Sequence, residues 1–457
     1  MGQHTVRQGL RLPALGEPVQ TVESARMARR VALLAADYIG LRPTMRVAVG
    51  DDVKRGELLF EDKQCPGVRF TAPATGTVVA IHRGDRRSFR SIVIELSREE
   101  REGRGADAVT FGSFSGRHPS GLSDDDVREL LMASGLWTSI RARPFSRVAD
   151  PQTRPHAIFV TAIDTEPFAP HVDVVLEGLH GPFERGLAAL SRLTDGMVYV
   201  CTAPDSGVPI PDGERIRHEE FVGVHPTGTA GLHIHLLEPV ARGRFVWHVG
   251  YQDVVAIGRL FETGQLAVER VVALAGPAEG RPRLVRTRLG ASTAELLADA
   301  PVDEGTRVVS GSLFAGRLAA GDTVGFLGRY HRQVCLIREG RERELLGWLA
   351  PGLGKFSASR TFLSTLAPGR RFSFNTSTNG SRRAIVPVGL YERVMPMDLL
   401  PTLLLRALVM QDVERAEELG CLELDEEDLA LCSFVCPSKL DYGAALRAVL
   451  TTIETEG

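Results

Sequence analysis

The sequence predicts a multidomain α/β protein, and two observations lead to this fold class. The chain has 457 residues, which is too long for one hydrophobic core and suggests about three domains. Its pattern of apolar residues also changes along the chain, from short β-like runs through alternating strand and helix signals to helical spacing at the end. We therefore expect a β-sandwich over residues 1–104, an α/β domain over 105–256, a smaller mixed domain with a β-rich extension over 257–386, and a helical domain over 387–457.

Residues 38–78 carry the signals for the first domain. The runs 47–53 and 56–60 are predicted as two short strands joined by a turn that needs glycine and aspartate for positive φ. A second turn at Gly76 precedes a strand over 77–81, and residues 31–34 add a strand before the pair. This order of short strands and turns resembles the biotinyl/lipoyl barrel-sandwich fold. The sandwich is expected to end near Glu95, and the charged run 98–104 to be a linker.

In biotinyl and lipoyl carriers a modified lysine sits at a hairpin tip shortly before an Ala-Pro pair. Lys63 is the nearest lysine here, but it lies ten residues before Pro73, and Cys65-Pro66-Gly67 lengthens the turn between them. The tip that a modifying enzyme would need is therefore distorted. We interpret Lys63 as a solvated loop residue rather than a carrier lysine.

The second domain shows strands that alternate with helices. A helix is expected from Ser123, where three aspartates suit a helix N-terminus. Apolar runs at 157–162, 197–201 and 221–224 are predicted strands, and residues 183–193 have a helical pattern between the first two. Such alternation favours a Rossmann-like layer.

The last two domains follow from strand order and helical spacing. Two runs at 270–276 and 284–290, then a helical stretch at 293–297, suit a β-grasp module of the SLBB type. Beyond Pro387 apolar residues recur at spacings of three and four. The expected helices cover residues 397–410, 413–419, 426–432 and 442–453.

Composition excludes several classes of protein. A net charge of −3 gives no basic field for nucleic acid. The longest apolar candidate, 399–410, is interrupted by Pro401 and Arg406 and falls short of the roughly 18 residues that span a bilayer. The first twelve residues lack an apolar signal region, and six scattered cysteines suit a reducing compartment. We expect no transmembrane segment.

Two motifs have the form of cofactor sites. Residues 134–147 (SGLWTSIRARPFSR) resemble the glycine-rich FMN and NADH loop that is found in the complex I flavoprotein and in the C subunit of the Rnf complex. Residues 431–437 (LCSFVCP) resemble the end of a ferredoxin-like cluster motif.

The whole chain resembles one family within this group, the A subunits of the Na+-translocating NADH:quinone oxidoreductases (Na+-NQR). The resemblance runs in order through YIGLRPTM, RLVRTRLG, GRYH, NTSTNG, YERVMPM and the segment 420–436. Several matches in the same order make this a specific signal.

Both cofactor motifs depart from the patterns they resemble. A phosphate cradle needs glycines so that backbone N–H groups can approach the anion, but after Gly135 the later glycine positions hold Thr138, Ile140, Arg141 and Arg143. A four-iron cluster needs four thiolates. If Cys432 and Cys436 were the last two ligands, the spacing of the motif would place the first two at Glu426 and Leu429, and Cys421 lies too early in the chain to replace either. We expect no flavin and no iron on this chain.

Two weaker candidates have structural interpretations. His225, His233 and His235 gather near a glycine-rich run, and His233 and His235 are expected to share one strand face, a spacing that zinc can use. No carboxylate or thiol of matching spacing follows, so ordinary hydrogen-bonded histidines are favoured. Residues 311–316 (GSLFAG) are expected to form a tight turn.

The resemblance implies a function for the complex and a place for this chain. Complexes of this family oxidise NADH, reduce ubiquinone and export Na+, with NADH oxidation and the flavins in other subunits. The chain is then expected to be peripheral, on the cytoplasmic face of the bacterial inner membrane, against the membrane-embedded B subunit. Its expected role is structural, or to shape the quinone site, without a redox cofactor of its own. The alternative is a flavin- or NADH-binding oxidoreductase subunit in its own right.

One surface is predicted to meet quinone or a partner subunit. In the flavin-binding relatives the segments 40–45 and 137–141 border the cofactor, and a cleft that has lost its ligand would suit a quinone ring or a docking partner. The residues predicted for this surface are Arg42, Met45, Trp137, Ile140, Arg141 and Arg143. The alternative is that these side chains only fill the former cofactor space.

Overall fold

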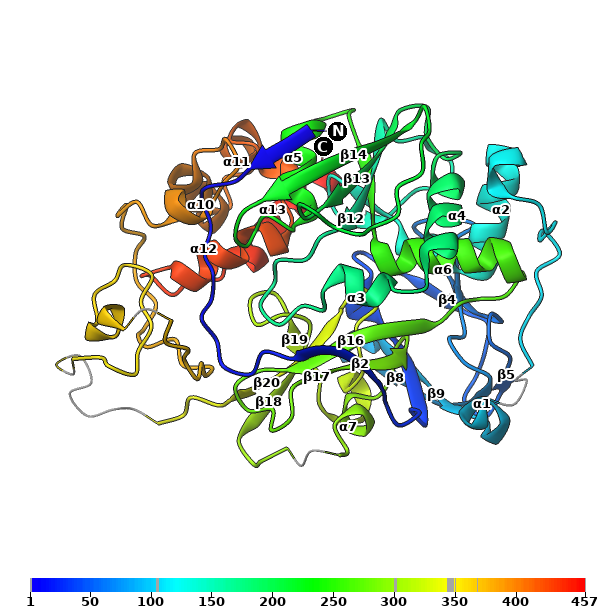
Figure 1. Ribbon diagram of the computed structural model, residues 1–457, viewed down its shortest axis with the longest axis horizontal. Helices are drawn as coiled ribbons and strands as arrows, with labels where there is room; N and C mark the ends of the chain where they lie inside the picture. Colours follow the sequence, from blue (N-terminus) through cyan, green and yellow to red (C-terminus); the bar gives the residue numbers. More distant parts are fainter. Residues whose placement is uncertain are drawn as a thin grey trace.

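The computed structural model describes residues 2–103, 107–299, 302–342, 349, 351–367 and 369–456. Figure 1 shows a mixed α/β molecule in which four sheets fill the centre and one side, and the C-terminal helices gather at the opposite end. Among the described residues no helix is both long and apolar enough to cross a bilayer.

Two small sheets form the sandwich. The first, in the order β3-β9-β8-β5, consists of Arg30–Leu34, Phe89–Leu96, Gly76–Arg83 and Asp52–Val53. The second, in the order β4-β6-β7, consists of Pro43–Met45, Leu58–Asp62 and Arg69–Thr71. Phe60 and Phe70 stack between them with ring centroids 4.6 Å apart. These two rings are fully buried and fix the centre of this core.

The expected hairpin of residues 47–53 and 56–60 is wrong in its pairing. β5 pairs with β8, whereas β6 pairs with β4 and β7. The prediction of positive φ is confirmed at the glycines, since Gly50 and Gly56 have φ of 98° and 88°, but neither Asp51 nor Asp52 has positive φ. The turn therefore carries the chain from one sheet of the sandwich to the other.

The charged run after the sandwich is also more ordered than the expected linker. Residues Arg98–Glu102 form helix α1, capped by the side chain of Ser97. Glu100 is buried, and its carboxylate lies 2.7 Å from the Arg288 guanidinium. This buried ion pair ties the end of the sandwich to the third domain.

The second domain contains a seven-stranded sheet in the order β1-β14-β13-β12-β15-β10-β11. Five strands from β1 to β15 are parallel, and β10 and β11 are antiparallel. Their bounds are Gly2–Thr5, Ile216–Val222, Met197–Thr202, Ala157–Ala162, Val246–Gly250, Arg141–Arg143 and Arg147–Val148. The helices are α2 (Asp124–Ser134), α3 (Val172–Leu176), α4 (His180–Leu190), α5 (Ala230–Leu237) and α6 (Tyr251–Thr263).

Local chemistry explains two of these helices. Ser123 and Asp126 form the capping box that begins α2, where the sequence predicted a helix. Gly258 lets α6 lie against α4, because a Cβ there would be 1.7 Å from the Pro182 carbonyl oxygen. The two helices cover one face of the parallel sheet in Figure 1.

The third domain has a six-stranded sheet in the order β19-β18-β20-β16-β17-β2. The strands are Arg317–Leu318, Thr306–Ser310, Gln333–Arg338, Glu269–Ala275, Arg283–Arg288 and Val19–Ser24, with short helices α7 (Thr293–Leu296) and α8 (Gly321–Val324). Its N-terminal strand β2 comes from the start of the chain, as β1 does in the second sheet. The first 24 residues therefore join two sheets outside the sandwich.

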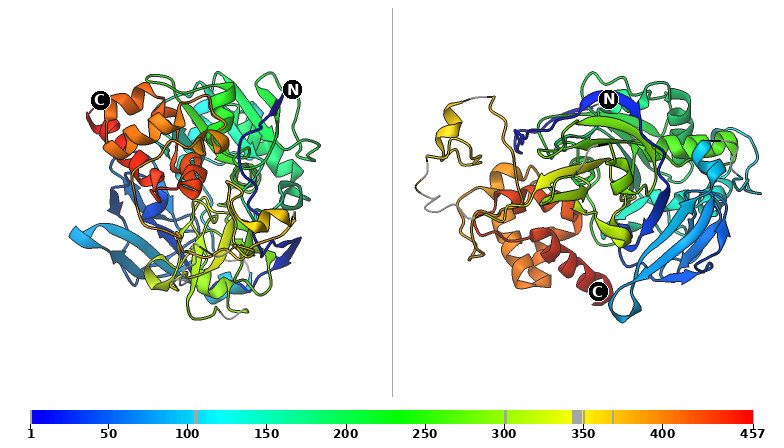
Figure 2. Two further views of the ribbon diagram at one scale, coloured as in Figure 1. Left: turned by 90° about the vertical axis from the view of Figure 1, so that its left-hand side faces the viewer. Right: turned by 90° about the horizontal axis from the view of Figure 1, so that it is seen from below.

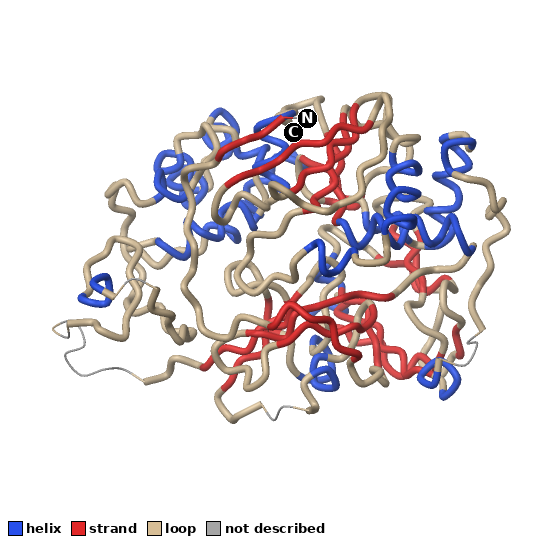
Figure 3. The backbone as a smooth tube through the Cα atoms, in the orientation of Figure 1, coloured by secondary structure: helices blue, strands red, loops and turns tan. Residues whose placement is uncertain are grey.

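The C-terminal part contains short helices around a separate apolar core. They are α9 (Tyr391–Val394), α10 (Pro401–Met410), α11 (Val413–Glu418), α12 (Ala430–Val435) and α13 (Tyr442–Glu456), with 3-10 turns η6 (Cys421–Glu423) and η7 (Glu426–Leu429). Figure 3 shows a long tan segment between β20 and these helices. In its described part the regular element is one 3-10 turn, η5 (Leu363–Leu366).

Candidate functional site

The predicted phosphate loop is packed into the protein. After α2 the chain turns at Gly135, with φ of 79°, into the 3-10 turn η4 (Leu136–Ser139). A Cβ at Gly135 would lie 2.3 Å from the Thr71 hydroxyl of the sandwich, so glycine serves here to bring two domains together. All four side chains of η4 are buried. The loop is filled by its own side chains.

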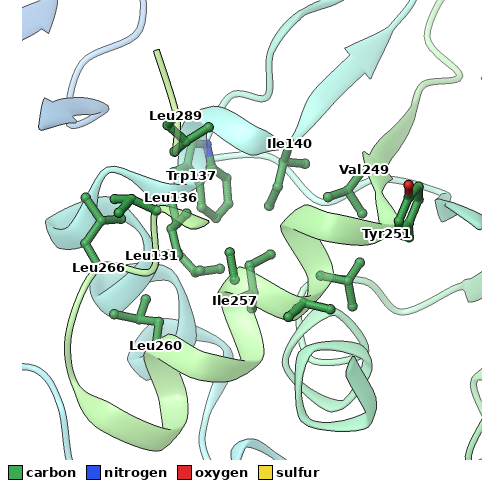
Figure 4. Close-up of a cluster of buried hydrophobic side chains, with 14 of the residues drawn as sticks. Leu131, Leu136, Trp137, Ile140, Val249, Tyr251, Ile257, Leu260, Leu266 and Leu289 are labelled. Atoms are coloured by element: carbon green, nitrogen blue, oxygen red, sulfur yellow. The ribbon is translucent and has the colours of Figure 1, made fainter. Parts of the chain in front are cut away.

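Trp137 shows why the loop does not fit a flavin phosphate. Its side chain is fully buried, and its indole N–H donates to the Ala149 carbonyl at 2.7 Å. The Trp247 ring meets it edge to face at 5.4 Å. Figure 4 shows Trp137 and Ile140 among apolar side chains of α2, α6 and the neighbouring strands. The backbone N–H groups of Thr138 and Ile140 donate to carbonyls of the loop itself, so they are not available to an anion.

Arg143 lies at the centre of a buried ionic cluster that joins β10 to η7. Its guanidinium is 3.0 Å from Asp428, 3.4 Å from Glu427 and 3.5 Å from Asp425. Burial opposes its charge, but the three carboxylates outweigh burial and raise the pKa of Arg143. Arg447 adds a second cation 2.9 Å from Asp425. The cluster fastens the C-terminal helices to the edge of the parallel sheet.

Arg141, two residues earlier on β10, is only partly buried and stacks on an aromatic ring. Its guanidinium carbon lies 4.4 Å from the centre of the Tyr330 ring, and the Tyr330 hydroxyl donates to the Thr138 carbonyl at 2.7 Å. The contact links the predicted loop to the third domain. Arg141 is therefore the arginine of the pair that retains access to solvent.

A small cavity opens beside this contact, where the sandwich, the η4 loop and the third domain meet. Its volume is about 40 Å³, which holds a few water molecules and is too small for a quinone ring. Asp37, Tyr38 and Arg329 supply its polar groups, and apolar side chains such as Phe70 and Leu289 supply the rest. Burial raises the pKa of Asp37 despite its ion pair with Arg317.

The other two predicted residues lie elsewhere. Arg42 precedes β4 of the sandwich and is exposed, and Met45 ends the same strand and is half-buried. The Arg42 backbone N–H donates to Asp62 at 3.0 Å. The structure thus places the six predicted residues in four settings: a strand edge for Arg42 and Met45, an apolar core for Trp137 and Ile140, an aromatic contact for Arg141 and an ionic cluster for Arg143.

Sequence reasoning missed a charged group at the carboxyl end of the parallel sheet. Directly after β12, Asp164 pairs with Arg332 of the third domain at 2.8 Å. Burial and the Asp164 carboxylate raise the pKa of nearby Glu166 to about 8. The signal was present in the sequence, because acidic residues following a buried strand occupy the edge where α/β sheets bind ligands.

The expectation that His233 and His235 share a strand face is wrong. Both lie on helix α5 (Ala230–Leu237), whose residues 230–234 are buried. His233 contacts the Thr227 carbonyl at 2.9 Å, and His235 contacts Glu423 at 2.7 Å. Burial lowers the pKa of His225 and His233 to about 4. All three are hydrogen-bonded or stacked within the protein.

The cysteines and Lys63 complete the predicted candidates. Cys432 lies on α12 and Cys436 directly after it, both buried. The Cys436 thiol lies 3.3 Å from the Tyr391 hydroxyl and 3.2 Å from the Tyr442 hydroxyl. Lys63 is exposed in the bend after β6. Within the described ranges no group of three or more His, Cys, Asp or Glu side chains could hold a metal ion.

Comparison with known proteins gives one consistent family. Three domain models match: the NqrA N-terminal barrel-sandwich hybrid domain at residues 4–97, the NqrA second alpha/beta domain at 122–266, and the NQRA C-terminal domain, of the SLBB type, at 271–321. Several relatives are named as the A subunit of Na(+)-translocating NADH-quinone reductase. They include the proteins of Cellvibrio japonicus, 52% identical, and of Yersinia pestis and Hahella chejuensis, each 50% identical, and each alignment covers 99% of both chains.

A solved structure of an NAD+-reducing [NiFe]-hydrogenase is also similar, with 13% identity and a TM-score of 0.36 over 50% of this chain and 48% of that one. This likeness is too weak to support an argument about fold or function.

Proposed function

Because this chain belongs to the family of A subunits of the Na+-translocating NADH-quinone reductases, we propose that it serves that complex as a peripheral subunit on the cytoplasmic face of the bacterial inner membrane. The observation that carries the proposal is identity of 50% or more along 99% of both chains. The three family domains follow one another in the same chain. The complex oxidises NADH and reduces quinone while it moves Na+. We propose the membrane-embedded B subunit as its direct partner and ubiquinone as the quinone.

The subunit is proposed to carry no redox cofactor of its own. The buried side chains of η4 support this, because they occupy the loop where a phosphate cradle would need free backbone N–H groups. The residues around Cys432 and Cys436 support it too, because the first two ligand positions of a cluster motif are occupied by Glu426 and Leu429, which supply no thiolate. NADH and flavin chemistry is then assigned to other subunits.

We also propose a finer division of the fold. The parallel strands β1 to β15 with α4 and α6 have the form of a Rossmann-like layer. The helices from α9 onward, with their own apolar cluster, support a C-terminal helical domain over residues 387–457. The other proposed domains cover 1–104, 105–256 and 257–386.

The quinone or partner surface remains a proposal, and burial reduces the number of predicted residues that could contribute to it. Trp137 and Ile140 are fully buried, and Arg143 is held by carboxylates. Arg42, Met45 and Arg141 are the predicted residues with access to solvent. We therefore propose that any quinone-shaping contact from this set is made by those three.

The test uses the assembled complex. Replacing Arg42→Gln together with Arg141→Gln should leave co-purification with the membrane subunits intact, because Arg42 is exposed and glutamine at position 141 can still lie against the Tyr330 ring. It should reduce the rate of quinone reduction while NADH oxidation with a soluble electron acceptor stays at the control rate. Arg86→Gln with Arg87→Gln, on an exposed turn of the sandwich, is the matched control. Equal quinone reduction in both variants would reject the quinone-shaping role.

Assembly is tested separately. The chain should co-purify with the other subunits from detergent-solubilised membranes, and recovery only as a free protein would contradict the proposed function. Flavin absorbance of the purified chain distinguishes the alternative. A stoichiometric yellow cofactor would favour a flavin-binding oxidoreductase subunit.

A further inference from the structure

One end of the molecule exposes apolar side chains out of proportion to its share of the sequence. In the described part of the chain 21 large hydrophobic side chains are exposed, and ten of them lie between Leu349 and Met410. A soluble surface tolerates scattered apolar residues, but a concentration of this kind marks a contact site. The exposed set is Leu349, Leu353, Leu363, Leu366, Val386, Val388, Leu400, Leu403, Val409 and Met410.

The same stretch is strongly basic. Residues 351–390 contain six Lys and Arg residues and no Asp or Glu, although acids outnumber bases in the whole chain. Five of the six, all arginines, are exposed. In the described structure no carboxylate pairs with Arg360 or Arg382, while Arg371 pairs with Glu17 of the N-terminal segment. Among the described residues, Arg360 and Arg382 therefore offer positive charge that no carboxylate compensates.

The segment is anchored at its base and projects beyond it. Phe372 exchanges backbone hydrogen bonds with the N-terminal segment, accepting from Leu15 at 3.0 Å and donating to Pro13 at 2.8 Å. The Phe356, Phe372 and Phe374 rings pack together beside Phe434 of α12. The right view in Figure 2 shows the yellow segment standing off the body next to the orange helices.

Helix α10 extends the apolar surface. Leu404, Leu405 and Leu408 face the C-terminal core, and the opposite side presents Leu403, Val409 and Met410. Leu400, at the start of this helix, is also exposed, and Met410 at its end has 78% of its surface accessible. The outward face also carries Arg406. One side of this helix is buried in the C-terminal core, and the other side is apolar with one cation. Such an outer side suits contact with another apolar environment.

We propose that residues 351–367 and 369–390, together with the outward face of α10, form a surface that binds a lipid bilayer with anionic head groups. Arginines attract the head groups, and exposed leucine and valine side chains enter the interface beneath them. A bilayer supplies both chemistries to this surface, in which the described part of 351–390 has one short 3-10 turn and no strand, whereas a protein partner would need a matching acidic and apolar shape. The proposal rests on the proposed function and deepens it, because it adds a direct lipid contact to the peripheral attachment.

The test is binding of the purified full chain to sedimenting vesicles. Vesicles of phosphatidylcholine with phosphatidylglycerol should bind more protein than vesicles of phosphatidylcholine alone, and added salt should reduce the difference. Arg360→Gln with Arg382→Gln should weaken partitioning into the anionic vesicles by roughly 25-fold, because each cation near the surface contributes about fivefold. Arg86→Gln with Arg87→Gln removes the same charge from the sandwich turn and should leave partitioning within about twofold of the parent chain.

The apolar contribution is tested with a second pair. Leu363→Ser with Leu366→Ser should reduce partitioning by roughly tenfold or more at high salt as well, since burial of leucine does not depend on ionic strength. Val49→Ser with Val79→Ser, two exposed sites on the sandwich, is the control. Equal loss in test and control pairs, or no binding of the parent chain to anionic vesicles, would overturn the proposal.

Co-purification separates this proposal from the proposed function. Loss of vesicle binding with unchanged recovery of the complex means that the surface binds lipid and that other contacts hold the subunit. Loss of co-purification in the Arg360 and Arg382 variant with unchanged vesicle binding would overturn the lipid proposal and assign the surface to a protein partner.

Discussion

The η4 loop and the 351–390 segment differ in the burial of their side chains. In η4 each side chain is buried, and Trp137 has both an aromatic neighbour and a hydrogen-bond acceptor. In the 351–390 segment leucines and arginines face solvent, and Leu366 has 79% of its surface accessible. The η4 sequence that resembles a cofactor loop thus forms part of the packed interior, whereas the exposed charge and apolar surface of 351–390 form the contact surface that we propose. The two regions should therefore respond differently to substitution.

The largest effect is expected at Trp137. The Trp137→Ala change should lower the free energy of unfolding by about 4 kcal/mol, because it leaves a cavity in a packed core and an unpaired carbonyl at Ala149. Denaturant unfolding measures the change. Leu366→Ala, in the exposed segment, should stay within about 0.5 kcal/mol of the parent chain. Similar small effects for both would mean that Trp137 is not a core residue.

The ionic cluster comes next. Arg143→Ala should cost about 3 kcal/mol, because it leaves the buried Asp428 carboxylate without its cation and removes the partner of the half-buried Glu427. The loss is expected to be less than total, since Arg447 still neutralises Asp425. Arg406→Ala, on the exposed face of α10, is the matched control. Limited proteolysis should also release the C-terminal helices from the Arg143→Ala variant sooner, and an unchanged cleavage rate would contradict the role of the cluster in fastening them.

Local patterns predicted much of this fold, and long-range pairing limited the rest. The strand at 31–34, the capped helix after Ser123 and the terminal helix near 442–453 follow from signals within a few residues. Signals within a few residues could not predict that β5 pairs with β8 or that β1 lies beside β14. Gly2 of β1 is aligned with Glu219, which is far away along the chain. Short strands carry too little pattern to specify such partners.

The candidate site shows the same limit. The sequence identified the loop at Trp137 and the arginines beside it, and it named filling of the former cofactor space as an alternative. It gave no means of separating Arg141 from Arg143. Their difference arises from partners far along the chain, Tyr330 for one and Asp428 for the other. The histidines on α5 were misread because an apolar run of eight residues fits a buried strand as well as a helix.

Glu166 gives a pH-dependent prediction. Its pKa is raised to about 8 in the folded protein, so its stabilising contribution is complete below its ordinary pKa and is lost as the pH rises through 8. Glu166→Gln should therefore flatten the decline in the free energy of unfolding between about pH 5 and pH 8 by roughly 2 kcal/mol, a value discounted because part of the residue reaches solvent. Glu177→Gln, at an exposed position, should leave the profile unchanged. A parallel shift at every pH would show that Glu166 does not titrate in this range.

The smallest change in the free energy of unfolding is expected at Cys432 and Cys436. Substitution there distinguishes buried thiols from ligands of an iron–sulfur cluster. The Cys436 thiol lies between two tyrosine hydroxyls that are 2.8 Å apart. A serine hydroxyl can replace it in that network, so Cys436→Ser should cost about 1 kcal/mol, the cost of a slightly smaller side chain and a rearranged hydrogen bond. Iron and sulfide, measured on the parent chain and on the Cys432→Ser and Cys436→Ser variants, should stay at background in all three. An iron content near one cluster per chain that falls in either variant would show that the thiols are ligands, and the assignment of redox chemistry to other subunits would then fail.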